Sequence, residues 1–201
     1  MSAPTQKKFP RYEILISGSG GQGIILAGII LAEAGIKDSL FVVQTASYGP
    51  ESRGGASQSD VILATEPIDY PAIIHPDFII ALTEEAAEKF LPEAKDTTKV
   101  LLDSTWIEKI PKTHAQEVYL IPITKDSAVR FGRAIYANII AVGFFTGVSG
   151  VLSPESVRDS INLHVPKKFL EENLSAFEFG LELAKKEQPV KVEKVGTIFS
   201  R

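Results

Sequence analysis

Short apolar runs along the chain alternate with longer apolar or amphipathic stretches. The runs that predict strands cover residues 12–17, 40–45, 60–64, 77–82, 100–103 and 118–121. The stretches that predict helices cover residues 24–34, 84–91, 127–149, 154–162, where Ser153 is the expected N-cap, and 166–186. This order predicts an α/β fold, in which helices flank a mostly parallel sheet and the C-terminal part is helical.

The ends of the chain differ in composition from the region between them. Residues 1–11 are short, basic and without an apolar segment, so we expect a flexible arm rather than a signal peptide. Residues 12–188 are predicted to form a single domain, and residues 189–201 a C-terminal strand or arm. Without an export signal, the expected location is the cytoplasm.

The stretch 134–154 carries no charge and is long enough to be compared with a membrane span. Its polar Asn138 and three glycines, and the breaks expected at Gly150 and Pro154, favour a buried helix. We therefore predict no membrane association.

A glycine cluster separates the first predicted strand from the first predicted helix. Gly18, Gly20 and Gly23 satisfy G-x-G-x-x-G, which is typical of Rossmann-like folds and leaves backbone N–H groups open to an anion. Two readings remain open: a dinucleotide site, or a tight turn for close helix–sheet packing in which Gly20 and Gly23 tolerate no bulky side chain. The second strand, expected to pair in parallel with the first, ends without the acid that binds the ribose of NAD.

A polar, glycine-rich loop is predicted at residues 46–57, on the same carboxyl edge of the sheet as the glycine cluster. It contains an aromatic side chain, Tyr48, together with Glu51 and Arg53. Arg53 either pairs with Glu51 inside the loop or binds a carboxylate, a phosphate or a partner chain. We prefer the second role, since a loop side chain at this edge contributes little to packing.

Composition excludes several kinds of chemistry. The chain of 201 residues has no cysteine, so it holds no disulfide and supplies no thiolate to an iron–sulfur cluster. Its three histidines lack ligand spacing, which argues against a metal site, and a net charge of -4 argues against nucleic-acid binding. Arg130 and Arg133 are predicted on one side of a long helix, as a solvated face or as contacts to CoA phosphates or a partner. Asn138 is expected to bond a loop near the carboxyl edge.

Two glycine-rich motifs in combination carry a family resemblance. They read GSGGQGIILAG at 18–28 and SYGPESRGGASQSDV at 47–61. The chain resembles the gamma subunit, or catalytic gamma domain, of the thiamine-diphosphate-dependent 2-oxoacid:ferredoxin oxidoreductases. With IDYP at 68–71, it is most similar to the 2-oxoglutarate subgroup.

The resemblance implies a subunit that is inactive alone, in an enzyme that oxidises a 2-oxoacid with CoA to an acyl-CoA and reduces ferredoxin. It implies alpha and beta partners, in some enzymes also delta, which hold thiamine diphosphate, Mg²⁺ and the iron–sulfur clusters; the isolated chain could form a homodimer. The alternatives are the pyruvate, branched-chain or indolepyruvate subgroup, and a stand-alone Rossmann-like nucleotide or CoA-binding module. No catalytic residue and no metal ligand is predicted on this chain. The residues predicted to bind a cofactor or a subunit are Gly18, Gly20, Gly21, Gln22, Gly23, Tyr48, Glu51, Arg53, Gly54, Gly55 and Asn138.

Overall fold

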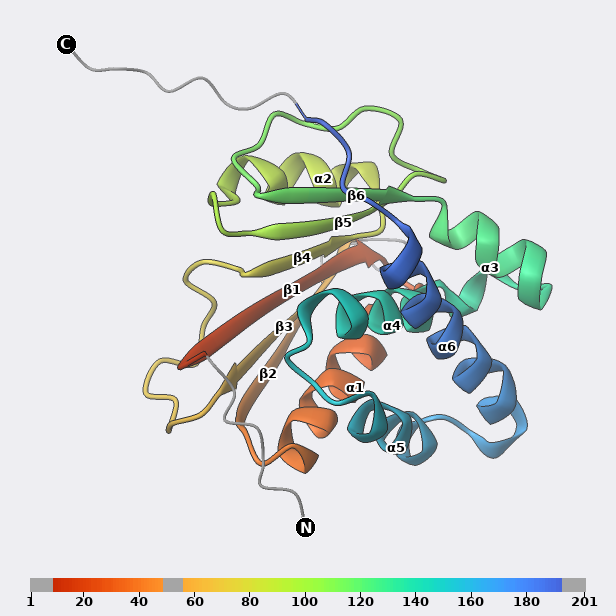
Figure 1. Cartoon of the computed structure of the whole chain (residues 1–201), viewed down its shortest axis with the longest axis horizontal. Coiled ribbons are helices and arrows are strands. Elements are labelled where there is room, and N and C mark those ends of the chain that lie inside the picture. Colours follow the sequence, from red (N-terminus) through yellow and green to blue (C-terminus); the bar gives the residue numbers. More distant parts are fainter. Residues whose placement is uncertain (1–8, 49–55, 193–201) are drawn as a thin grey trace.

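A single sheet forms the centre of the molecule (Figure 1). The structure, a computed structural model, describes residues 9–48 and 56–192. Within these residues six strands occur in the order β2-β3-β1-β4-β5-β6. Their bounds are β1 Arg11–Ser19, β2 Phe41–Tyr48, β3 Ala56–Ala64, β4 Phe78–Ala81, β5 Lys99–Asp103 and β6 Glu117–Ile121.

The strand directions confirm a mostly parallel sheet and correct one expected pairing. Strands β1, β4, β5 and β6 are parallel neighbours, whereas β3 pairs antiparallel with both β1 and β2. The first two strands therefore point the same way but do not pair, because β3 lies between them. A short connection can join β2 to β3 only as antiparallel neighbours, and this hairpin fills the place beside β1.

Six helices are described, α1 Ile24–Lys37, α2 Glu84–Phe90, α3 Ile123–Phe131, α4 Ala137–Ser149, α5 Pro154–His164 and α6 Leu170–Lys186. Ser153 caps α5 as predicted, with its hydroxyl accepting a hydrogen bond from the Ser156 amide. The single helix predicted over 127–149 is wrong. Gly132, at φ 72°, ends α3 in the left-handed conformation, and a 3-10 turn at Ala134–Tyr136 precedes α4.

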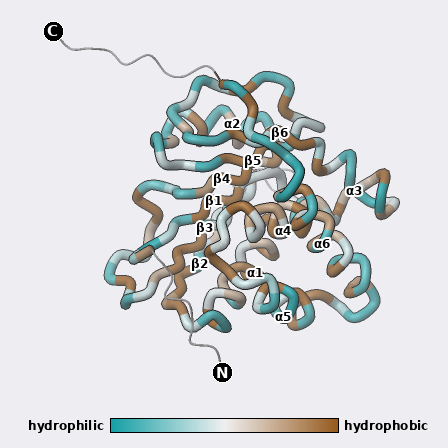
Figure 2. The backbone as a smooth tube through the Cα atoms, in the orientation of Figure 1, coloured by the Kyte–Doolittle hydropathy of each residue, from teal (hydrophilic) through white to brown (hydrophobic). Residues whose placement is uncertain are grey.

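Apolar residues concentrate along the central strands of the sheet (Figure 2). Their side chains belong to two cores, one on each face of the sheet. Alternate residues of β1 belong to different cores: Ile14 and Ile16 pack with α1, α4 and α6, while Leu15 packs on the α2 side. Helix α4 is buried along nearly its whole length. Among the residues that the structure describes, no helix is both long and apolar enough to cross a membrane.

Two glycines let α4 and α6 pack backbone to backbone. A Cβ atom added at Gly180 would lie 2.2 Å from the Ile140 carbonyl oxygen, and one added at Gly143 would lie 2.3 Å from the Phe177 carbonyl oxygen. Both distances are far below an ordinary contact, so no side chain fits here without separating the helices. This crossing fixes the position of α4, which carries Asn138.

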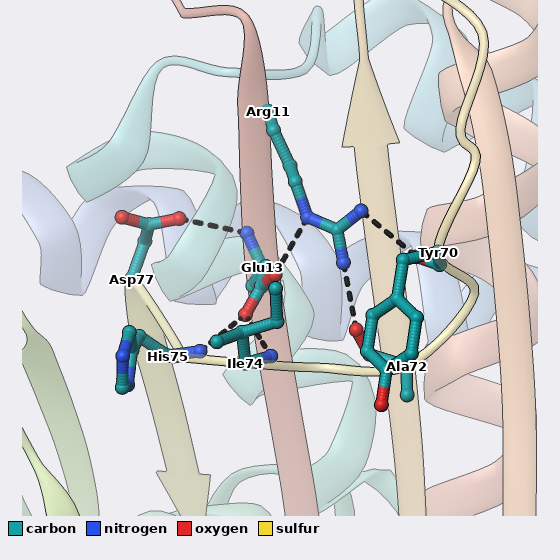
Figure 3. A network of polar contacts seen from close by, with 7 residues as sticks. All are labelled: Arg11, Glu13, Tyr70, Ala72, Ile74, His75 and Asp77. Carbon is teal, nitrogen blue, oxygen red and sulfur yellow. Dashed lines mark hydrogen bonds and ion pairs between the residues drawn. The ribbon is translucent and has the colours of Figure 1, made fainter.

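A charged network lies at the amino end of β1, away from the glycine cluster (Figure 3). The buried Glu13 carboxylate accepts hydrogen bonds from Arg11 Nε and from the backbone amides of Ile74 and His75. The Glu13 amide donates to Asp77 Oδ2 at 2.8 Å. Burial raises the pKa of Asp77, and the nearby Glu13 charge adds to this. The network anchors the segment before β4 to the central strand and leaves the carboxyl edge to other chemistry.

Candidate functional site

The turn between β1 and α1 is built by Ser19, Gln22 and two left-handed glycines. Gln22 Oε1 accepts a hydrogen bond from the Ser19 amide at 2.7 Å, and the Gln22 amide donates back to the Ser19 carbonyl oxygen at 3.2 Å. Gly21 and Gly23 have φ angles of 88° and 72°, a region that L side chains rarely adopt. The polar Gln22 thus closes the turn itself.

The conformational demand for glycine falls on Gly21 and Gly23, while the expectation that Gly20 tolerates no bulky side chain stays a prediction. Gly20 does not adopt a positive φ; Gly21 and Gly23 do. Gly18 lies inside β1, where an added Cβ would stand 2.4 Å from Gln22 Oε1 and 2.9 Å from Ile24 Cδ1. The motif therefore combines one close packing position with two backbone positions that need glycine.

Asn138 bonds the glycine turn, as predicted. Its Nδ2 donates to the Gly23 carbonyl oxygen at 3.0 Å, and its Oδ1 accepts from the Ile139 amide at 2.9 Å. The Asn138 side chain is buried, and a Cβ at Gly23 would lie 2.3 Å from Nδ2. Gly23 is thus fixed both by its φ angle and by this contact, which joins α4 to the start of α1.

The carboxyl end of β2 is neutral, as the sequence indicates. Gln44 Nε2 donates to Ser59 Oγ at 2.9 Å and to the Thr45 carbonyl oxygen at 3.1 Å. Gly28 of α1 packs closely on the same Ser59, with an added Cβ only 2.0 Å from Oγ. An NAD-binding fold carries an acidic residue here, which binds the ribose. In this chain the position holds Gln44, whose hydrogen bond to Ser59 contributes to the packing between α1 and the hairpin.

The β2–β3 hairpin reaches the carboxyl edge beside the glycine turn. Tyr48 pairs with Ser57, and Ser19 pairs with Ala56, so both ends of the connection lie at that edge. The strands extend further than predicted, to Tyr48 and from Ala56, because cross-strand pairing continues into the polar segment. Tyr48 is 73% exposed. Four predicted site residues lie outside the described residues: Glu51, Arg53, Gly54 and Gly55.

Two hollows open on the other side of the glycine turn and share Gly21 and Ile135. The first, of about 260 Å³, is lined by Gly21, Gly23, Leu26, Arg133, Ile135, Tyr136, Asn138, Val165, Pro166, Phe169 and Asn173. The second, of about 290 Å³, is lined by Gly21, Gln22, Trp106, Thr124, Ala134, Ile135 and Ala137. The glycine turn and Asn138 thus form part of an apolar surface with few polar groups, a composition typical of ligand or partner sites.

Arg130 and Arg133 do not share one face of a helix, contrary to expectation. Gly132 ends α3 between them, so Arg130 lies in the last turn of α3 and Arg133 lies outside that helix. The Arg130 guanidinium lies 4.5 Å from the centre of the Phe179 ring, on α6. Arg133 lines the first hollow, with its guanidinium 5.9 Å from the centre of the Phe169 ring.

A third, smaller hollow of about 150 Å³ lies next to the hairpin ends and is polar. It is lined by Ser17, Ser47, Tyr48, Ala56, Gln58, Glu85, Ala86 and Lys89. Nearby Asp60 accepts a hydrogen bond from Gln58 Nε2 at 2.8 Å. Burial raises the pKa of Asp60, with a smaller contribution from the Glu13 charge, although the Gln58 hydrogen bond opposes the rise.

Asp103, at the carboxyl end of β5, is a site-forming residue that sequence reasoning missed. Its buried carboxylate accepts hydrogen bonds from the amides of Thr105 and Thr124 and from the Thr124 hydroxyl. It therefore ties the end of β5 to the first turn of α3, next to Trp106 and the second hollow. The polar sequence Asp103-Ser104-Thr105, directly after an apolar strand, could have indicated this residue, because functional sites form at the carboxyl ends of strands in such sheets.

Across residues 9–48 and 56–192, no group of three or more His, Cys, Asp or Glu side chains is arranged to hold an ion. Arg133 is the one charged side chain among the residues that line the first two hollows.

These features define an α/β domain with a Rossmann-like glycine turn. The two apolar hollows of the domain lie beside that turn, at the carboxyl edge of the sheet. Residues 13–183 match the profile of the family described as pyruvate ferredoxin/flavodoxin oxidoreductase. The chain belongs to this family.

Individual relatives agree with that assignment. The chain is 43% identical over 178 residues to the 2-oxoglutarate synthase subunit KorC of Methanocaldococcus jannaschii, covering 87% of this chain and 95% of the relative. The crystal structure of a keto/oxoacid ferredoxin oxidoreductase gamma subunit from Geobacter sulfurreducens is 40% identical, with a TM-score of 0.80 and coverage of 89% and 98%. The fold also recurs in the 2-oxoglutarate:ferredoxin oxidoreductase of Magnetococcus marinus, at 22% identity and a TM-score of 0.80; this chain spans 33% of that chain.

Proposed function

We propose that the chain is the gamma subunit of a 2-oxoglutarate:ferredoxin oxidoreductase. The supporting observation is the gradation among relatives. Four subunits named for 2-oxoglutarate synthase are 37–43% identical to this chain over nearly their whole length. Relatives named for ketoisovalerate, indolepyruvate or pyruvate are 24–31% identical. This order favours 2-oxoglutarate over the other 2-oxoacids.

In the proposed complex, 2-oxoglutarate loses carbon dioxide, its remaining acyl group is oxidised and transferred to CoA, and ferredoxin accepts the electrons. Thiamine diphosphate supplies the carbanion chemistry when it is bound. The two apolar hollows of this chain do not fit that cofactor, because their lining holds one guanidinium and no carboxylate for Mg²⁺. With no cysteine, the chain also supplies no thiolate to a cluster. We therefore assign the thiamine diphosphate and the iron–sulfur clusters to the alpha and beta subunits, together with a delta subunit where the enzyme has one. The proposed location of the complex is the cytoplasm.

The chain's own contribution is a rigid surface at the carboxyl edge. Gln22 closes the turn, Asn138 holds it against α4, and Asp103 fixes the adjacent strand end. A surface fixed in this way binds a partner or substrate without first having to be ordered. We propose that the glycine turn, Tyr48 and Asn138, together with Glu51, Arg53, Gly54 and Gly55, belong to the part of the subunit that faces the assembled active site.

Reconstitution tests this function. The chain is purified alone and with its alpha and beta subunits, and CoA-dependent ferredoxin reduction is measured with 2-oxoglutarate, pyruvate, 2-oxoisovalerate and indolepyruvate. We expect no turnover by the chain alone, and in the complex the highest kcat/KM with 2-oxoglutarate. Full activity of alpha and beta without this chain would refute the assignment. A complex that prefers another 2-oxoacid would move the chain to a different subgroup.

A further inference from the structure

The two hollows beside the glycine turn meet in one continuous surface, which we call the edge groove. They share Gly21 and Ile135 and have volumes of about 260 and 290 Å³. The groove thus crosses the turn between β1 and α1 and extends from the end of β5 to the start of α6. Its lining includes Gly21, Leu26, Trp106, Arg133, Ile135 and Phe169.

Large apolar side chains stand exposed along this groove. Trp106, the one tryptophan of the chain, is 54% exposed, and Ile135 is 58% exposed. Exposed apolar groups gathered around a concave surface mark interaction sites, and tryptophan is among the residues most enriched at the centres of protein interfaces. Leu26 and Phe169 add apolar walls within the same hollow as Arg133.

Arg133 supplies the charge of the groove. Within residues 9–48 and 56–192 it forms no ion pair, and its guanidinium lies 5.9 Å from the centre of the Phe169 ring. The whole chain has a net charge of -4, yet residues 123–149 carry three cationic side chains and one acidic side chain. The groove is therefore complementary to an apolar group that has a carboxylate beside it.

We propose that the edge groove is a docking site for a segment of a partner oxidoreductase subunit that presents an apolar side chain next to an Asp or Glu. The apolar side chain enters between Leu26 and Phe169, and the carboxylate pairs with Arg133. This inference rests on the proposed function, because it takes the alpha–beta assembly as the partner. CoA is a poorer fit, since its several phosphate charges would meet one guanidinium among the lining residues.

Hydrogen bonds from buried side chains stabilise the backbone at two places in the edge groove. Asn138 fixes Gly23 in the floor, and Asp103 bonds the amides of Thr105 and Thr124 at the Trp106 end. A preformed groove loses little conformational entropy when a partner binds, so its exposed side chains can contribute their full contact energy.

Binding of the full chain to the purified alpha–beta assembly tests the docking site. The variants are Ile135→Asp, Arg133→Glu and Arg133→Lys, and the readouts are the Kd for alpha–beta and the melting temperature of the free chain. We expect Ile135→Asp and Arg133→Glu to weaken binding at least about tenfold, with the free chains as stable as wild type because both positions are at the surface. Arg133→Lys should fall between, since it keeps the charge and loses the planar fork. Raising the salt concentration should weaken wild-type binding more than Arg133→Glu binding.

Phe41→Asp is the matched control. Phe41 begins β2 at the opposite edge of the sheet and is 48% exposed, so the same change from apolar to acidic should leave the Kd within about twofold of wild type. Groove variants that bind like wild type would overturn the docking site. Arg133-dependent binding of CoA to the isolated chain would also overturn it, in favour of a small-molecule site. Wild-type chain that fails to bind alpha–beta at all would instead refute the proposed function.

Discussion

Replacing Gly23 by alanine should show how the glycine turn is held. Two costs are expected. A left-handed alanine costs roughly 1–2 kcal/mol. Its Cβ would also lie 2.3 Å from Asn138 Nδ2, where ordinary contacts begin at 3.4 Å, so the buried amide must move by about 1 Å. Forced displacements of this kind in a packed interior cost about 1–3 kcal/mol. We expect Gly23→Ala to lose about 3 kcal/mol of unfolding free energy in total.

Gly21→Ala separates the two costs. Gly21 has a φ of 88°, and an added Cβ there meets nothing within 4 Å, so this variant reports the backbone cost alone. Asn138→Ala removes the obstacle at Gly23. This variant loses two hydrogen bonds, one to the Gly23 carbonyl oxygen and one from the Ile139 amide, although the Gly23 carbonyl oxygen still accepts from the Ala27 amide. Its own cost should be about 2 kcal/mol for these bonds, plus a cavity term.

The four proteins of this cycle are compared by urea denaturation of the isolated chain, with Gly21→Ala as reference. The double variant Gly23→Ala/Asn138→Ala should be more stable than the sum of the single effects predicts, by about 1–2 kcal/mol. Strict additivity would show that the two residues do not compete for space. A Gly23→Ala variant no less stable than Gly21→Ala would refute the steric argument directly.

Three further predictions concern the scaffold. Gly180→Ala should destabilise the chain by about 1–3 kcal/mol in urea denaturation, since it forces α4 and α6 apart. The control Ser175→Ala, on the exposed face of α6, should be neutral or slightly stabilising. Equal effects of the two variants would contradict the close crossing. Glu13→Gln should cost about 1–3 kcal/mol by the same assay and leave binding to alpha–beta unchanged, because the network lies at the amino edge; a binding defect in a stable variant would disagree. Asp60→Asn should raise the melting temperature at pH 7. Burial raises the folded-state pKa of Asp60, so the contribution of this residue to stability is complete below its unfolded pKa of about 4 and is lost as the pH rises through the folded pKa. The stability advantage of Asn over Asp should therefore vanish at pH 3. A difference in melting temperature that does not depend on pH would exclude this cause.

Much of the fold could be predicted from local patterns. Each of the six strands and the approximate places of the helices follow from apolar periodicity and caps, including Ser153. The bond from Asn138 to the glycine turn could be predicted because a buried amide needs a partner. The place of β3 could not, because strand order depends on pairing between residues distant in sequence, and a β-α-β reading fits the same local pattern. The helix break at Gly132 was missed because a single glycine is often tolerated inside a helix.

Sequence patterns could predict only those parts of the candidate site whose residues are neighbours in the sequence. The glycine turn and the hairpin end are contiguous motifs, so their common edge followed from the order of strands. The edge groove joins Trp106, Ile135 and Phe169, which are separated by about thirty residues each and carry no shared motif. Only tertiary packing, of α4 against the sheet and of α6 against α4, brings them to the glycine turn.

The antiparallel β3 has a consequence for how members of the family diverge. Tyr48 and Ser57 are cross-strand partners, so the two strand ends that the β2–β3 connection joins lie at neighbouring points of the sheet. Residues can be inserted or deleted between such anchors without shifting the register of either strand, whereas a connection between parallel strands must keep the length needed to cross the sheet. The strand ends joined by this connection lie beside the glycine turn. A change in its length would therefore alter the surface next to the turn while the scaffold stays constant.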